Sequence, residues 1–221
     1  MATLQADNHV QRIEVGKLVL ARAAHTDHQN LKSKRTAFAR VHEQLSRAQA
    51  KLDQAEATLS SVTEALAEAD LTQDDAVEAL ATTLVGDGQP RANPFRGLGV
   101  GSPAEVKRAG YAEEVKIINR LSHSLGRRKL GAASKKALKE ALAAARGVTA
   151  ALTRAAQQQE KVDEARTARD ALVLPWVRAF SAYKRAARAA EDDGATGAFK
   201  SLFGAEKKAA RRAAAGDAPE H

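Results

Sequence analysis

The chain has 221 residues, 35 Lys and Arg against 27 Asp and Glu (a net charge of +8), and only 4% aromatic residues. It contains no cysteine, which excludes disulfides, thiolate metal sites and cysteine nucleophiles, and it has neither a run of 18 apolar residues nor a signal-peptide pattern over residues 1–7, so we expect a cytoplasmic protein. Few aromatic residues with abundant alanine and charge are typical of thin helical packing rather than of a thick globular core.

The first element is a predicted long helix over residues 8–70. Alternating steps of three and four residues from Val10 to Ala69 reach mostly apolar positions, as in the heptad pattern of a coiled coil. Lys17, Asp27 and Lys34 are the exceptions on this seam. Such a seam predicts a second long helix packed against the first.

Two shorter helices follow, separated by one break. Thr72 and Asp75 resemble a capping box, which predicts a helix over residues 73–85. Glycines and prolines predict a loop over 86–101. Ser102 followed by Pro103 is a typical helix start and predicts a helix over 103–125.

The second long helix is predicted over residues 134–190, with a seam of alternating three- and four-residue steps. Pro175 should kink it, because the proline ring lacks a backbone donor and crowds the carbonyl four residues earlier. Residues 191–221 are predicted to form a short docking segment, carrying Phe199, Leu202 and Phe203, and a flexible basic tail.

These elements predict an all-α fold, an elongated, coiled-coil-like antiparallel helical hairpin with a small helical bundle at the loop end. Residues 1–190 would form a single helical domain. The polar seam residues suggest a register in which residue i faces approximately residue 193 − i, which places Asp27 opposite Arg166 and Leu31 opposite Val162.

The bundle should bury apolar residues that a lone hairpin would leave in water. They come from the two shorter helices: Val77, Leu80, Leu84, Tyr111, Val115, Ile118, Leu121 and Leu125. In the loop, the turn at Asn93, Pro94 and Phe95 predicts either an aromatic docking point or a plug over the loop end.

Charge is distributed in segments. Residues 53–85 carry 8 acids and no base, whereas residues 102–146 carry 11 bases against 4 acids, so the loop end should be neutralised internally. Residues 1–52, with 9 bases against 4 acids, and 147–190, with 8 against 4, leave the opposite end positive. This end is therefore the candidate surface for an anionic partner.

Two groups of residues are candidate binding sites. The basic group comes from the second long helix and the tail: Arg178, Lys184, Arg185, Arg188, Lys207, Lys208, Arg211 and Arg212. The aromatic group is Trp176, Phe180 and Tyr183, spaced to share one side of a helix. It predicts either a buried aromatic lock against Val10 and Ile13 or an exposed docking patch.

No catalytic motif, metal-ligand pattern or nucleotide-binding fingerprint occurs, so no cofactor is expected. We therefore expect a non-enzymatic structural or adaptor protein that binds a protein partner or another copy of itself. The main alternative is sequence-nonspecific nucleic-acid binding through the basic end and tail. A weaker alternative is peripheral binding to an anionic membrane surface.

Overall fold

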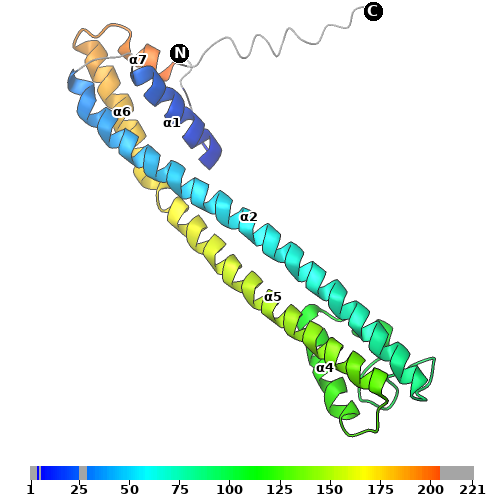
Figure 1. The fold of residues 1–221 in the computed structure, drawn as a ribbon. Coiled ribbons are helices and arrows are strands. Elements are labelled where there is room, and N and C mark those ends of the chain that lie inside the picture. The colour runs from blue at the N-terminus through cyan, green and yellow to red at the C-terminus, as the bar shows by residue number, and fades with distance from the viewer. Residues whose placement is uncertain (1–3, 5, 25–28, 205–221) are drawn as a thin grey trace, which may run out of the picture. The chain divides into compact units, whose positions relative to one another are not determined.

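The structure, a computed structural model, describes residues 4, 6–24 and 29–204. Seven helices occur in these residues (Figure 1). They are α1 (His9–Ala23), α2 (Gln29–Gly86), α3 (Pro103–Val106), α4 (Tyr111–Leu125), α5 (Ala132–Asp170), α6 (Val173–Asp192) and α7 (Ala198–Phe203).

The chain divides into two compact units. Unit 1 comprises Met1–Leu52 and Ala165–His221, and unit 2 comprises Asp53–Glu164. Helix α2 contributes its first part to unit 1 and its second part to unit 2. Each unit has its own buried core, and the two are described in turn.

The long helices run antiparallel to one another within each unit. In unit 1, Phe38 of α2 contacts Trp176 and Tyr183 of α6. In unit 2, Gln158 of α5 donates a hydrogen bond of 3.0 Å to the carbonyl of Ala55 in α2. The all-α helical hairpin is therefore confirmed.

The helix predicted over residues 8–70 is wrong at its N-terminal side, where α1 is a separate helix. Asn8 caps its start with a capping box, and Arg35 of α2 donates to the carbonyl of Ala23 at its end (2.9 Å). Figure 1 shows α1 beside α7. As a separate helix, α1 buries Val15 and Val19 in the core of unit 1, and these residues lie off the predicted seam, whereas the seam residues Val10 and Lys17 are exposed.

The boundary predicted between residues 70 and 73 is also wrong, since α2 continues to Gly86. The hydroxyl of Thr72 donates to the carbonyl of Glu68 within the helix (3.0 Å) instead of capping a new one. Val77 and Leu84 are buried in unit 2, so packing favours helix through this stretch.

The helix predicted over 103–125 is two helices, α3 and α4, with Gly110 at the N-cap of α4. The Ser102 cap is confirmed, with Glu105 completing a capping box. The Pro175 kink is confirmed too: α5 ends at Asp170 and α6 begins at Val173, so the chain leaves the helix at Ala171, whose carbonyl the proline would crowd.

The predicted register is wrong. Phe38 contacts Trp176, and Leu66 clusters with Val148, so residue i faces approximately residue 214 − i. Leu31 lies in the core of unit 1, whereas Val162 belongs to unit 2. Asp27 lies outside the described residues.

The shift from 193 to 214 corresponds to three heptads, so seam residues still face seam residues. The heptad pattern alone therefore cannot distinguish the two registers. The ends of the helices at the loop decide between them, because α2 reaches Gly86 and α5 begins at Ala132.

The bundle of α2, α3, α4 and α5 in unit 2 buries six of the eight predicted residues, and Val115 is half-buried against the same core. Tyr111, the first residue of α4, is 38% exposed. Phe95 is fully buried in the same core, with Leu98 beside it, so the loop plugs the bundle and Phe95 offers no docking surface. The amide of Phe95 donates to Asn93 Oδ1 (3.0 Å), which fixes the turn.

Candidate functional site: the basic surface of unit 1

The positive charge of the chain is concentrated in unit 1. Its sequence carries 20 Lys and Arg against 11 Asp and Glu, a net charge of +9, whereas unit 2 carries 15 against 16, a net charge of −1. An excess of this size on one unit attracts anions over roughly a Debye length, about 8 Å at physiological salt. Unit 1 is therefore where an anionic partner would bind.

On α6 the basic residues lie on the side away from the core. Arg178 and Arg185 are exposed and two turns apart, so they share one side of the helix. Trp176, Phe180 and Tyr183 occupy the opposite side. The helix is thus amphipathic, with its apolar side already covered.

The other predicted basic residues differ in exposure. Arg188 is exposed and its guanidinium lies 4.6 Å from the ring centroid of Phe199, whereas Lys184 is half-buried. The four basic positions of the tail, Lys207, Lys208, Arg211 and Arg212, lie outside the described residues.

Helix α2 adds further exposed cations to unit 1. Lys32, Lys34 and Arg40 are exposed on different sides of α2, and we call them, together with Arg178, Arg185 and Arg188, the basic surface, a name for this set of exposed cations of unit 1.

Other cations of unit 1 stabilise the fold. Arg22 donates to the carbonyls of Leu202 (3.3 Å) and Gly204 (2.9 Å), and Arg35 caps α1. These two guanidiniums are hydrogen-bonded inside unit 1, so we do not include them in the basic surface.

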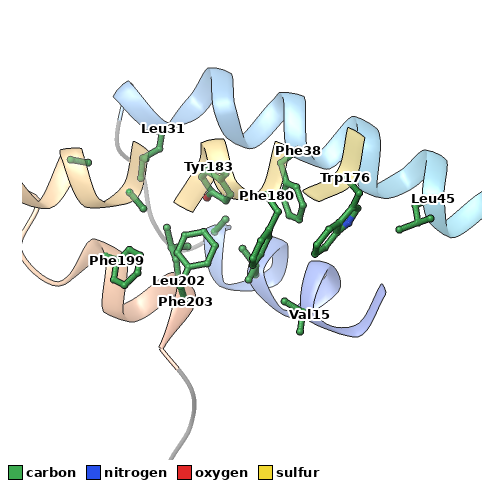
Figure 2. Close-up of a cluster of buried hydrophobic side chains, with 14 residues drawn as sticks. Val15, Leu31, Phe38, Leu45, Trp176, Phe180, Tyr183, Phe199, Leu202 and Phe203 are labelled. Carbon is green, nitrogen blue, oxygen red and sulfur yellow. The ribbon is translucent and has the colours of Figure 1, made fainter. Parts of the chain in front are cut away.

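The predicted aromatic group is buried, as Figure 2 shows. Trp176 is 1%, Tyr183 1% and Phe180 8% exposed. The lock interpretation agrees with this placement. Of its two predicted partners, Ile13 packs against the cluster but Val10 is 69% exposed, and Phe38 packs against all three rings. In this conformation the three rings present no docking surface.

Helix α7 completes the aromatic core, as the short docking segment predicts. Phe203 contacts the rings of Phe180 and Tyr183, both at a centroid distance of 5.5 Å. Figure 2 shows Phe199, Leu202 and Phe203 on the same side of the cluster. Phe38 was missed as the central ring, although its seam position was predicted, because the predicted register gave it other partners.

His42 is a polar residue of this core that sequence reasoning missed. It is 6% exposed and lies against Gly16, where a methyl group would meet its ring. Burial lowers the pKa of His42, and the charge of Lys17 lowers it further. Gly16, a glycine inside a helix, was the available signal for this close approach, because glycine lacks a side chain and lets another residue lie against the backbone.

Among the described residues, no group of three or more His, Cys, Asp or Glu is arranged to hold a metal ion. None of the described helices is long and apolar enough to cross a membrane. An open groove of about 660 Å³ in unit 2 is lined by small and apolar side chains and by Arg91, with Lys107 paired to Glu78 at 3.1 Å.

Comparisons of the chain with family models, curated proteins and solved structures found no match.

Proposed function

We propose that this chain is a non-enzymatic adaptor protein that binds an acidic protein partner through the basic surface of unit 1. The observation that carries the proposal is the charge difference between the units, +9 against −1. A surface of one sign speeds encounter with a partner of the opposite sign and selects against partners of the same sign.

The side of α6 that carries charge is the side available for binding. Its aromatic residues are committed to the core, so partner recognition would depend on Arg178 and Arg185 rather than on the aromatic group. Arginine suits this role because its planar guanidinium binds carboxylates in a bidentate manner.

Nucleic-acid binding is the second candidate, favoured by the same basic surface and by the basic residues of the tail. Binding of this kind would engage phosphates without reading bases, and its affinity would fall steeply with salt. Membrane-surface binding has less support, because the large apolar residues exposed on α6 are Leu174 and Val177, both at its start.

A titration of the full chain against a poly-glutamate peptide, duplex DNA and anionic vesicles, at low and physiological salt, tests the proposal. We expect salt-dependent binding to the peptide and no binding to DNA or vesicles at physiological salt. Tight DNA binding with a steep salt slope would replace the adaptor proposal with the second candidate.

A charge-reversal pair identifies the surface. Arg178→Glu with Arg185→Glu should abolish peptide binding. Lys135→Glu with Lys139→Glu changes the net charge equally on exposed positions of α5 in unit 2 and should leave binding unchanged. Equal losses in both variants would mean that net charge alone, and not the basic surface, governs binding.

A further inference from the structure

Unit 2 contains a buried carboxyl group at the start of α4. Glu114 is 1% exposed, and its Oε1 has no hydrogen-bond partner among the described residues. Burying an ionised carboxylate without a partner is strongly unfavourable, so this environment favours the neutral, protonated acid.

The residues beside Glu114 on α2 are also polar and incompletely bonded. Gln73 is fully buried and neither polar atom of its amide is hydrogen-bonded in the described structure. Asp70 and Asp74 each have a buried Oδ1 that also lacks a hydrogen-bond partner among the described residues. Buried polar atoms are normally hydrogen-bonded, so five exceptions in one helix contact call for an explanation.

The charged groups that act on Glu114 raise its pKa. Burial raises the pKa of Glu114 to about 7; the nearby Gln73 amide opposes the shift, and the carboxylates of Asp74 and Asp70 add to it. Burial, followed by the charge of Asp74, also raises the pKa of Asp70.

A cation on another element that acts at this contact is Lys107, whose pKa the carboxylates of Glu78, Asp74 and Asp75 raise. Next to α3, Lys107 is paired with Glu78. On α4, Glu113 is paired with Lys116 (3.2 Å) and Arg120. The α5 residues that cluster with Val115, one position along α4, are apolar: Val148, Ala151, Leu152 and Ala155.

We propose that the α2–α4 contact at Glu114 is a proton-dependent latch, in which α4 packs firmly on α2 while Glu114 is protonated and loosens when it ionises. The protonated acid can donate its O–H to an oxygen of Asp70, Asp74 or Gln73. The ionised acid cannot donate and adds a third negative charge to a buried site.

Loosening would uncover an apolar helix face. Ile118, Leu121 and Leu125 lie on the same side of α4 as Glu114 and are fully buried. A loosened α4 would therefore expose these side chains to water. This inference concerns unit 2 and does not depend on the basic surface of unit 1.

The sign of the pH effect follows from the direction of the shift. The packed state holds the proton up to a pH of about 7, whereas an exposed glutamate releases it near 4.5. The latch is therefore fully stabilising below pH 4.5 and weakens as pH rises through 7. Since each pH unit in this window changes the opening equilibrium by up to tenfold, opening of α4 should increase on the order of 50-fold between pH 5 and 8.

Amide hydrogen exchange of the full chain at pH 5 to 8, corrected for the intrinsic pH dependence of exchange, measures this opening. In the unmodified chain the α4 amides should show the increase. In Glu114→Gln the opening equilibrium should not change with pH. Glu113→Gln, at the exposed neighbouring position, should keep the increase. A wild-type profile as flat as that of Glu114→Gln, or loss of the increase in Glu113→Gln, would overturn the latch.

A second measurement does not depend on the folding of any variant. Carboxyl-carbon NMR titration of the unmodified chain reports the ionisation of Glu114 directly. A midpoint near 7 supports the latch, and a midpoint near 4.5 contradicts it.

Discussion

Trp176 Nε1 donates a hydrogen bond of 3.3 Å to His42 Nδ1, and both side chains are buried in unit 1. An indole N–H can only donate, so the histidine must present Nδ1 as an acceptor and carry its proton on Nε2. The bond links α2 to α6 and holds His42 in its neutral form.

This bond predicts that unit 1 loses stability in acid. The pKa of His42 is lowered from 6.5, so as pH falls below 6.5 the unfolded histidine takes up a proton that the folded one does not. Urea unfolding at pH 7.5 and 5, followed by the fluorescence of the single tryptophan, measures the loss. His42→Gln keeps an acceptor without the titration and should lose less stability between the two pH values. The exposed His123→Gln should behave like the unmodified chain, and equal acid losses in both variants would refute the role of His42.

A matched glycine pair tests the close packing of α1. In Gly16→Ala the new methyl group would lie 2.3 Å from His42 Nδ1, so the histidine must move, and we expect a loss of about 1–3 kcal/mol in the free energy of unfolding. In Gly147→Ala nothing lies within 4 Å of the methyl position on α5, and we expect a gain of about 0.5–1 kcal/mol from helix propensity. Denaturant unfolding measures both changes; a neutral Gly16→Ala would mean that α1 does not pack this closely.

Engineered cysteines test the register, since the chain has no native thiol to compete. Cysteines at Leu66 and Val148 should crosslink on oxidation, because these residues share a buried cluster in unit 2. Cysteines at Leu31 and Val162, which the register of 193 − i would pair, should not. Gel mobility under non-reducing conditions distinguishes the outcomes. Preferential crosslinking between positions 31 and 162 would support the register of 193 − i instead.

Arg22 should hold α7 against unit 1. Because a hydrogen bond from a charged donor is stronger than a neutral one, Arg22→Gln should cost about 1.5 kcal/mol and speed amide exchange in α7. The exposed Lys200→Gln on α7 itself serves as the control and should leave exchange unchanged. Unchanged exchange in Arg22→Gln would show that the aromatic core alone retains α7.

Local signals in the sequence predicted local features of the fold. The apolar periodicity predicted helices, Ser102 and Pro103 predicted a capped start, and Pro175 predicted an interruption. These features depend on backbone chemistry within a few residues, so tertiary contacts did not override them. The exposure of Arg178 and Arg185 follows from the same periodicity.

Helix boundaries inside an unbroken apolar pattern depended on tertiary structure. The three- and four-residue steps run from Val10 into α2 without a break, so the apolar pattern did not show that α1 is a separate helix, which turns Val15 and Val19 toward the core instead of the predicted seam. The register was equally ambiguous, because a shift of three heptads preserves every seam position.

The sequence by itself determined the helical class, most seam residues of α2 and α5 and the segments that carry positive charge, since all three follow from composition and spacing. Only the tertiary structure decided which seam residues meet, and with them the partners of His42 and Glu114. Both residues have unusual protonation because burial removes them from water, and burial depends on contacts between residues far apart in the chain.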